Sequence, residues 1–349
     1  MARHFPAEWA PQGAVMLIWP HDRTDWAPRL EQAESAFAAF ALAITRFEPI
    51  VVVCRDEDTR DRALGRLAGV GCSRAAIATV LIDTNDTWAR DIAPLAVSDD
   101  GRPVLLDCRF NGWGGKFEHA LDAAFGAALI DSAGFATLGY EPCDLVLEGG
   151  AVDSDGQGTL LLNRPTVIDP RRNPGIDSAA AEASLRERLG ARRILWLDVP
   201  PLPGDDTDGH VDTLARFCDE RTIAYAAPHS RDDPAASMLG ALEEQLQTLR
   251  TAEGEPYRLV PLPGPTPFTT DAGAPCPASY ANFLLVNGGV LVPSYADAAD
   301  ATATERLQAA FAGRTALPVP ARTFVAQAGA LHCLSMQLPE GVFEDLALT

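Results

Sequence analysis

Apolar and polar positions alternate along the first part of the chain in short blocks that predict strands and amphipathic helices. Strands are predicted over 15–19, 50–54, 77–82 and 104–108, and helices over 29–47, 56–67 and 121–130. In 29–47 the apolar residues recur at helical spacing, so one face of this predicted helix is apolar. Helices alternating with strands are typical of an α/β fold.

The same alternation continues through the second half. Strands are predicted over 144–147, 158–162, 193–197, 213–217, 222–226, 259–262, 283–286 and 290–292, and helices over 178–189, 234–249 and 303–311. We expect Ser178 to cap its helix, Gly190 to end it, and Pro234 to begin the next. The last two strands flank Asn287-Gly288-Gly289, which is typical of a hairpin turn. Since the proline-rich patches near 200 and 263–277 are short, we expect a single domain over 1–349.

Composition narrows the possible partners. With 47% hydrophobic and 22% charged residues, the 349-residue chain is typical of a globular protein with a large core. The formal net charge of −20 disfavours binding to nucleic acids or anionic membranes. It suits a small cationic substrate, although most of these charges are expected simply to aid solubility.

The cysteines and the N-terminus bear on location. Seven scattered cysteines include no C-x-x-C pair and no zinc-finger spacing, which favours reduced thiols in the cytoplasm. The N-terminus has no apolar core of a signal peptide, and no run of about 18 uncharged apolar residues occurs. We therefore expect a soluble cytoplasmic protein.

Polar clusters follow several predicted strands, where sites are often built. The segment 83–94 contains Trp88, Arg90 and Asp91, and we expect a loop because it is too rich in Asp and Asn for a helix interior. The strand 144–147 ends in Glu148-Gly149-Gly150. A third cluster, 204–212, has several aspartates but lacks the spacing of an EF-hand. The glycine-rich segment 110–116 lacks the Lys-Ser/Thr of a P-loop, so we expect no phosphate site there.

Cys333 lies near the C-terminus, beside His332 and before an apolar run that predicts a buried strand. A free cysteine in such a place is more often inert core than nucleophile. The intervals between clusters change this view: Glu148 lies 57 residues after Asp91, His210 lies 62 after Glu148, and Cys333 lies 123 after His210, nearly twice the first intervals. A ring of five similar αβ units, each sending one loop to a common axis, would bring these residues into one pocket.

The chemistry of that pocket points to a planar cation. We expect His210 and Asp212 to lie on one face of a strand, two positions apart. One thiol, one imidazole and several carboxylates match structural zinc poorly. Two carboxylates can instead grip a guanidinium edge-on. The thiol could then attack its central carbon while a protonated imidazole gives a proton to the departing ammonia.

A series of motifs spans nearly the whole chain. They are Pro6-Ala7-Glu8-Trp9, Trp19-Pro20-His21, Asn85-Asp86-Thr87-Trp88-Ala89-Arg90-Asp91, Phe110-Asn111-Gly112-Trp113-Gly114-Gly115-Lys116, Leu147-Glu148-Gly149-Gly150, Asn173-Pro174, Thr207-Asp208-Gly209-His210-Val211-Asp212, Pro277-Ala278-Ser279-Tyr280-Ala281-Asn282-Phe283 and His332-Cys333. In this order they resemble the agmatine deiminase branch of the guanidine-modifying superfamily.

The resemblance implies the pentein fold, a five-bladed αβ propeller with pseudo-five-fold symmetry and a central active-site pocket. It also implies that the protein uses no metal or organic cofactor and forms a homo-oligomer, expected to be a dimer. The implied reaction is the hydrolysis of agmatine to N-carbamoylputrescine and ammonia, in putrescine biosynthesis. This reaction would pass through a covalent Cys-thiouronium intermediate. In this family pattern Cys333 is the nucleophile, and His210 acts first as an acid and then as a base. Asp91 and Asp212 clamp the guanidinium, and the Glu148 carboxylate orients His210 or the substrate. Trp88 forms part of the pocket wall. His332 is expected only to pack against the strand.

Departures from the family pattern leave alternatives open. The glycine-rich lead into His-Cys is here Ala328-Gly329-Ala330, Ser335 and Met336 replace the usual Thr and Gln, and Asp22 replaces an Asn. Arginine or a C-terminal peptidyl-arginine is an alternative substrate, with Arg90 or Arg164 binding its carboxylate, although pairing with nearby Asp is the more typical role. Further alternatives are an amidinotransferase, a non-catalytic binding protein of the same fold, and a metallohydrolase.

Overall fold

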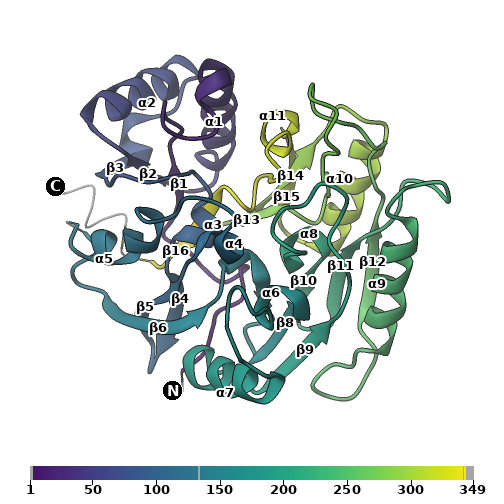
Figure 1. The fold of residues 1–349 in the computed structure, drawn as a ribbon. Coiled ribbons are helices and arrows are strands. Elements are labelled where there is room, and N and C mark those ends of the chain that lie inside the picture. Colours follow the sequence, from purple (N-terminus) through teal and green to yellow (C-terminus); the bar gives the residue numbers. More distant parts are fainter. Residues whose placement is uncertain (1–2, 133, 341, 343–349) are drawn as a thin grey trace.

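Five small sheets carry the strands of the computed structural model, which describes residues 3–132, 134–340 and 342 (Figure 1). The four-stranded sheet has the order β16 (Ser335–Leu338), β1 (Ala14–Ile18), β2 (Ile50–Cys54) and β3 (Ile77–Leu81). The three-stranded sheets are β4 (Leu95–Asp99), β5 (Arg102–Arg109), β6 (Gly139–Val146); β7 (Val152–Ser154), β8 (Thr159–Asn163), β9 (Arg193–Leu197); β10 (Ala215–Asp219), β11 (Thr222–Ala226), β12 (Arg258–Leu262); and β13 (Leu284–Val286), β14 (Gly289–Ser294), β15 (Thr315–Pro320). The α/β class expected from the sequence is confirmed.

Each three-stranded sheet repeats one pairing pattern. Its first two strands are an antiparallel pair, and its third strand lies parallel to the second. The four-stranded sheet begins in the same way, but its first strand comes from the far end of the chain, since β16 pairs antiparallel with β1 and β2 and β3 add in parallel. The C-terminal segment that carries Cys333 is therefore fixed by hydrogen bonds to an N-terminal strand.

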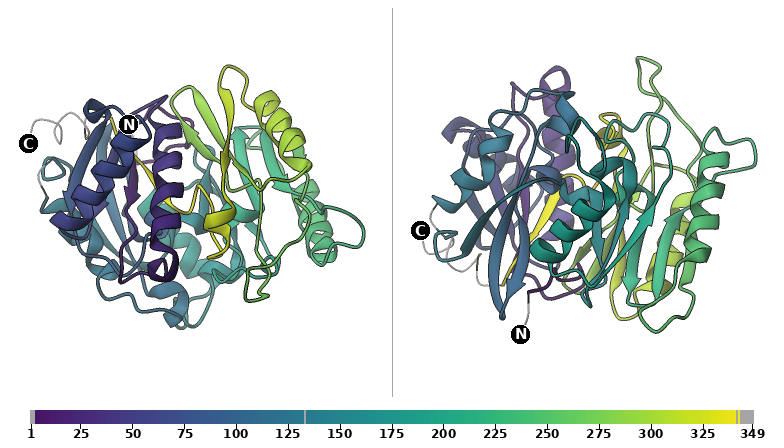
Figure 2. Two further views of the ribbon diagram at one scale, coloured as in Figure 1. Left: turned by 90° about the horizontal axis from the view of Figure 1, so that it is seen from above. Right: turned by 60° about the horizontal axis from the view of Figure 1, so that its bottom comes forward.

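The longer helices lie toward the periphery, over the sheets (Figures 1 and 2). They are α1 (Leu30–Ile44), α2 (Glu57–Gly69), α5 (Phe125–Ile130), α7 (Ser178–Leu189), α9 (Ala236–Thr248) and α10 (Ala299–Ala310). In α7 the residues Ala181, Leu185 and Leu189 are buried at four-residue spacing, as an amphipathic helix requires. Helix α1 also contacts β15, and α10 contacts β12, so helices join neighbouring sheets.

Short helical turns connect these elements. They are η1 (Ala27–Arg29), η2 (Arg74–Ala76), α3 (Ala89–Ile92), α4 (Gly112–Gly115), η3 (Asp122–Ala124), η4 (Gly149–Ala151), α6 (Arg164–Val167), α8 (Val211–Leu214) and α11 (Arg322–Val325). Three of them, α3, η4 and α8, immediately precede the first strand of a sheet, and η4 contacts both of the others. In Figure 1, α3 and α8 lie toward the middle of the molecule.

Several local predictions were wrong for physical reasons. The segment 83–94 was expected to be a loop but contains the helical turn α3, in which Arg90 and Asp91 are buried. His210 precedes α8 and Asp212 lies within it, so the pair is not on a strand. Helix α7 is capped by the Asp177 carboxylate, which accepts from the Ala180 N–H, rather than by Ser178.

Other boundaries and strands were also missed. Helix α9 begins two residues after Pro234. Strand β7 has three residues, too few to show a period. Strand β15 contains two prolines, which argue against a strand but are tolerated at the edge of a sheet. Strand β4 was missed because only alternate residues of its five are buried, directly after the polar segment. No helix in the described part of the chain is long and apolar enough to cross a membrane.

The junction between β16 and β1 can be tested at Gly13. Its N–H donates to the Leu338 carbonyl at 2.9 Å, and an added Cβ would lie 2.4 Å from the Pro339 carbonyl oxygen. We expect Gly13→Ala to lower the free energy of unfolding by about 1–3 kcal/mol, as overpacking does. Urea denaturation measures this change.

Gly65 is the matched control, because it lies inside α2 with no heavy atom within 4 Å of an added Cβ. Gly65→Ala should leave stability unchanged or raise it by up to about 1 kcal/mol, the gain in helix propensity. Equal effects of the two substitutions would contradict the proposed importance of the junction.

Candidate active site

Segments just before the first strand of each sheet bring one group of polar side chains together. The residues are Asp91 in α3, Glu148 before η4, His210 and Asp212 at α8, Asn282 before β13 and Cys333 before β16. Each of these side chains is 6% exposed or less. The repeated strand pattern thus places residues far apart in sequence in one buried cluster.

The distances connect these residues. The Cys333 Sγ lies 3.4 Å from Asp212 Oδ2, and Asn282 Nδ2 lies 3.1 Å from each of these atoms. On the other side, His210 Nδ1 lies 3.6 Å from Asp91 Oδ1 and His210 Nε2 lies 3.8 Å from Glu148 Oε2. The structure therefore brings together all five residues that the sequence analysis placed in one pocket.

Gly150 joins the two halves of the cluster. A Cβ built on it would lie 2.6 Å from His210 Nδ1, 3.0 Å from Asp91 Oδ1 and 3.1 Å from Asp212 Oδ2. A residue with a Cβ at position 150 would displace these groups, so this position requires glycine. Its N–H donates to Asp91 Oδ1 at 2.9 Å.

The His210 loop is shaped by Asp205. The carboxylate of Asp205 accepts from the Thr207 N–H at 3.0 Å, the Thr207 hydroxyl at 2.7 Å and the Gly209 N–H at 2.7 Å. The acidic run at 204–212 thus folds its own loop. Within the described residues no group of three or more His, Cys, Asp or Glu side chains is placed to hold a metal ion.

Several polar atoms of the cluster have no hydrogen-bond partner although they are buried. They are both ring nitrogens of His210, Glu148 Oε2 and Asp212 Oδ1. Buried polar groups in proteins are nearly always hydrogen-bonded. Unpaired acceptors on two carboxylates, gathered beside a thiol, fit a ligand that donates several hydrogen bonds.

The remaining carboxylate oxygens are held in place by the protein. Asp91 Oδ2 accepts from Trp113 Nε1 at 3.0 Å, and Glu148 Oε1 accepts from Arg172 Nε at 2.8 Å. The Arg172 side chain is fully buried and also donates to Asp208 Oδ2 and to the Thr207 carbonyl. Arg172 therefore ties Glu148 to the loop that carries His210.

The sequence analysis did not assign roles to Arg172, Trp113 or Asn282. Trp113 and Asn282 lie inside the quoted motifs, and Arg172 directly precedes one of them. For Asn282 a further signal was present, because the 123-residue gap between His210 and Cys333 leaves room for one more unit. Asn282 lies 72 residues after His210 and 51 before Cys333, in that unit.

The charges and the burial of the cluster keep both the His210 imidazole and the Cys333 thiol protonated. Burial lowers the pKa of His210, but the charges of Asp91 and Glu148 outweigh it and raise that pKa to about 9. Burial raises the pKa of the Cys333 thiol well above its ordinary value, and the nearby Asp212 and Asp91 charges raise it further. At neutral pH the imidazole is therefore a proton donor and the thiol is un-ionised.

A cavity of about 220 Å³ opens onto this cluster, with Cys333 and Asp91 in its wall. The predicted Trp88 lines it, together with Trp113 and Phe117. The Trp88 ring packs on Gly329, where an added Cβ would lie 2.1 Å from a ring carbon.

Aspartates contribute the ionisable groups of the remaining cavity wall. They are Asp25, Asp86 and Asp206. Among the described residues that line this cavity there is no Arg, Lys or His. The cavity therefore suits a ligand with a positive charge.

The two arginines considered for a substrate carboxylate lie elsewhere. Arg90 is buried, pairs with Glu8 at 3.4 Å and donates to Gln337. Arg164 donates to the Ser178 hydroxyl at 2.6 Å and stacks on Trp196. Neither lines the cavity.

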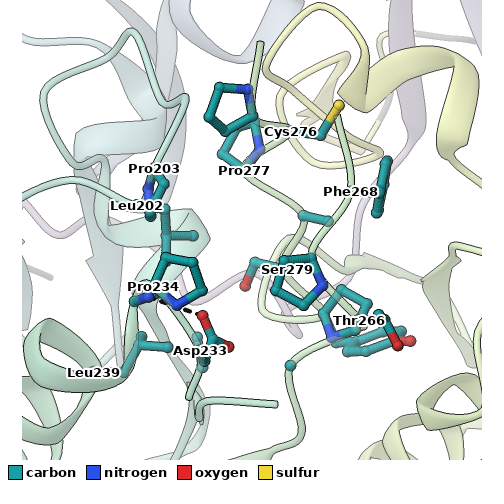
Figure 3. A pocket seen from close by; sticks show the side chains of 18 of the residues that line it. Leu202, Pro203, Asp233, Pro234, Leu239, Thr266, Phe268, Cys276, Pro277 and Ser279 are labelled. Atoms are coloured by element: carbon teal, nitrogen blue, oxygen red, sulfur yellow. Dashed lines mark hydrogen bonds between the residues drawn. The ribbon is translucent and has the colours of Figure 1, made fainter. Parts of the chain in front are cut away.

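A second cavity, of about 240 Å³, lies between prolines and apolar side chains and includes Cys276 and Asp233 (Figure 3). The Asp233 carboxylate already accepts from the Ala235 and His229 N–H groups, each at 2.8 Å. Without a base or a second carboxylate in its wall, this cavity does not fit the chemistry of the cluster.

Comparisons with known proteins match nearly the whole chain. The model of the family described as Porphyromonas-type peptidyl-arginine deiminase matches residues 4–339. A curated agmatine deiminase of Pseudomonas aeruginosa (strain LESB58) is 34% identical over 358 aligned positions, which cover 96% of this chain and 95% of that protein.

Two solved structures are also similar over most of their length. A cysteine-to-serine variant of C. jejuni agmatine deiminase with substrate bound superimposes with a TM-score of 0.89 at 30% identity, covering 97% of each chain. A Porphyromonas gingivalis protein described as a possible arginine deiminase gives a TM-score of 0.89 at 43% identity, covering 97% of this chain and 99% of that one.

The charge on His210 predicts how stability depends on pH. A histidine in the unfolded chain has a pKa of about 6.5, whereas that of His210 in the fold is raised to about 9. Its contribution to the free energy of unfolding is fully present below pH about 6.5 and is lost as pH rises through about 9. We expect His210→Gln to flatten this part of the stability profile, measured by urea denaturation between pH 6 and 10.

His229 is exposed and serves as the control. His229→Gln should retain the wild-type decline with pH. A His210→Gln profile parallel to that of the wild type would show that His210 is not held protonated.

Proposed function

Because the chain belongs to the Porphyromonas-type peptidyl-arginine deiminase family, we propose that it is an agmatine deiminase, which hydrolyses agmatine to N-carbamoylputrescine and ammonia. One observation carries the choice of substrate. The cavity has Cys333 and Asp91 in its wall, and Asp212 lies 3.4 Å from the Cys333 sulfur; the other ionisable groups of its described wall are aspartates, without any basic residue. The curated relatives are named agmatine deiminases.

The guanidinium group binds between Asp91 and Asp212 in this proposal. A guanidinium is planar and has five N–H donors and no acceptor. The unpaired Asp212 Oδ1 and Glu148 Oε2 are acceptors that such a group can satisfy. Charge-assisted pairs of this kind are roughly twice as strong as neutral hydrogen bonds.

Substrate binding also activates the nucleophile. The Asp91 and Asp212 charges raise the pKa of Cys333, and a guanidinium cation between them offsets both. The thiol can then lose its proton to water as the substrate enters. The thiolate Sγ forms a bond to the central guanidinium carbon and gives a tetrahedral adduct.

His210 handles the protons of the remaining steps. Its imidazolium gives a proton to one nitrogen of the adduct, the C–N bond breaks, and ammonia leaves with an S-alkylthiouronium on Cys333. The neutral imidazole then takes a proton from water, and the oxygen bonds to the same carbon. The C–S bond breaks as the hydroxyl proton passes to the departing sulfur, so Cys333 returns as a thiol and the ureido product keeps the oxygen as its carbonyl. Glu148, 3.8 Å from His210 Nε2, orients this ring.

The far end of agmatine carries a primary ammonium and no carboxylate, which fits the aspartates of the cavity. Burial raises the pKa of Asp86 to about 7 and that of Asp206 to about 6. A bound ammonium favours the ionised form of both. The α-carboxylate of arginine would enter the same region and be repelled.

Arginine is kept as the second candidate because the 43% identical relative is described as a possible arginine deiminase. An acceptor amine in place of water would give an amidinotransferase. Product analysis with glycine present separates this reaction from hydrolysis.

The whole chain is one catalytic domain in this proposal, and the five sheets are the blades of a propeller around the site. The shared strand pattern of the sheets supports this arrangement. The homodimer stays a prediction from the family resemblance, which light scattering tests, and the cytoplasmic location stays a prediction from the cysteine pattern and the N-terminal sequence.

The substrate assignment predicts a ranked panel. We expect ammonia release from agmatine, and release at least about 100-fold slower from arginine and from a peptide ending in arginine. Asp206→Asn should raise KM for agmatine about 10- to 100-fold, since a hydrogen bond to a charged group contributes about 1.5–3 kcal/mol. Asp86→Asn should act in the same direction.

Asp232→Asn, an exposed change outside the cavity, is the control and should leave KM unchanged. Faster turnover of arginine than of agmatine would overturn the substrate assignment. An unchanged KM in Asp206→Asn would remove that residue from the binding of the ammonium.

If a cation activates Cys333, Asp212→Asn should change the alkylation rates of Cys333 by a cationic and by a neutral reagent in opposite directions. Cationic 2-chloroacetamidine should alkylate Cys333 faster than neutral 2-chloroacetamide, after each rate is divided by its rate with glutathione. Asp212→Asn removes both the clamp and a charge that raises the thiol pKa. The variant should therefore react more slowly with the amidine and faster with the amide, followed by intact-protein mass spectrometry.

Cys333→Ala identifies any adducts on the other cysteines. Parallel changes of the two rates in Asp212→Asn would contradict the proposed role of the carboxylate.

A further inference from the structure

His332, the neighbour of the nucleophile, lies between two carboxylates. Its Nδ1 is 2.8 Å from Asp212 Oδ2 and its Nε2 is 2.7 Å from Glu8 Oε1. The ring is 1% exposed. The expectation that His332 only packs against the strand was therefore wrong.

Both contacts constrain the hydrogens of the ring. A carboxylate oxygen only accepts, so both contacts are hydrogen bonds only when both ring nitrogens carry hydrogen. Burial raises the pKa of Glu8, but Arg216, His332 and Arg90 outweigh it and hold that pKa well below its ordinary value. Burial likewise raises the pKa of Asp212. The hydrogen bond to His332 and the nearby positive charges outweigh burial and lower that pKa below its ordinary value. Two ionised carboxylates thus face the two ring nitrogens of His332.

The contact with His332 leaves Asp212 with one free oxygen. Oδ2 accepts from His332 and from Asn282 Nδ2, whereas the buried Oδ1 has no partner. Rotation of the carboxylate would break both hydrogen bonds at Oδ2. The atom left over is the one that a guanidinium can bind.

Glu8 is itself anchored. Its Oε2 accepts from Arg216 Nη2 and from Gln337 Nε2, the latter at 3.0 Å. Glu8 and Arg90 line a separate cavity of about 440 Å³ that includes neither Cys333 nor Asp91. Glu8 precedes β1 and His332 precedes β16, so the ion pair spans the junction of these strands.

We propose that His332 is a positioning residue, held by Glu8, that fixes the orientation of the Asp212 carboxylate and offsets its negative charge beside the Cys333 thiol. The kinetic part of this inference rests on the proposed guanidine hydrolysis. The hydrogen positions on the ring do not depend on it.

Two amide substitutions separate the halves of the bridge. In His332→Asn the amide nitrogen lies near the position of Nδ1 and can still donate to Asp212. In His332→Gln it lies near the position of Nε2 and can reach only Glu8. We expect His332→Gln and His332→Ala to lower kcat/KM for agmatine about 10- to 100-fold, the usual effect of losing a partner that orients a functional side chain. The kcat/KM of His332→Asn should be about 10-fold higher than that of either variant.

His21 provides a matched control, because it is also buried at 1% exposure but lies outside the cluster. His21→Asn should lower stability without changing kcat/KM by more than about 2-fold. Equal losses in His332→Asn, His332→Gln and His332→Ala would show that His332 only supports the fold.

A measurement without substrate decides the ring contacts even if the His332 variants do not fold. In ¹⁵N-labelled wild-type protein, the two ring nitrogens of His332 should both give the chemical shifts of protonated nitrogens at pH 7. Glu8→Gln should return one of them to the shift of an unprotonated nitrogen. A singly protonated ring in the wild type would overturn the bridge.

The two proposals fail in different ways. If the wild type hydrolyses no agmatine, the proposed function is wrong, and the ¹⁵N shifts still decide whether His332 bridges Asp212 and Glu8. If agmatine is hydrolysed and the ring is singly protonated, only the positioning role is wrong.

Discussion

The burial of three carboxylates around one imidazole is the constraint on which the rest of this structure depends. Asp91, Glu148 and Asp212 all lie within the buried cluster that contains His210. Removing an ion from water costs several kcal/mol unless it is paired and hydrogen-bonded. The interior therefore contains cations that proteins rarely bury. Arg172 pairs with Glu148, His332 pairs with Asp212, and further out Arg216 and Arg90 pair with Glu8.

The repeated sheet pattern makes this arrangement possible. Each sheet begins with an antiparallel pair, and the segment just before the first strand of each carries a polar residue of the cluster. The backbone of Gly150 packs so closely against the Asp91, His210 and Asp212 side chains that no Cβ fits there. The site is thus organised by backbone geometry before any ligand is bound, which is the condition for strong electrostatic stabilisation of a reacting group.

The negative charge near Cys333 that the protein leaves without a positive partner determines how the proposed reaction begins. The acidic cavity wall and the raised pKa of the thiol keep Cys333 un-ionised. A cationic substrate would supply the missing positive charge at the position where the thiolate must form. Selectivity and activation would then have one cause, because a neutral molecule would neither bind the clamp nor ionise the thiol.

The amino-acid sequence alone predicts the α/β class, the long helices, most of the strands, and the five residues of the cluster that carry the proposed chemistry. The predicted strands 50–54 and 193–197 and the predicted helix 178–189 coincide with β2, β9 and α7, because local apolar content and helix-ending residues are enough to set their bounds. The positions of Asp91, Glu148, His210, Asp212 and Cys333 came from their repeated spacing and from the family motifs. Other features are visible only in the folded protein: Asp91 and Asp212 lie on helical turns, Asn282 belongs to the cluster, Arg172 holds Glu148, and His332 joins Asp212 to Glu8. These contacts join residues as much as 324 positions apart, and no local period encodes them, because they follow from the pairing of β16 with β1 and from the need to neutralise buried charge.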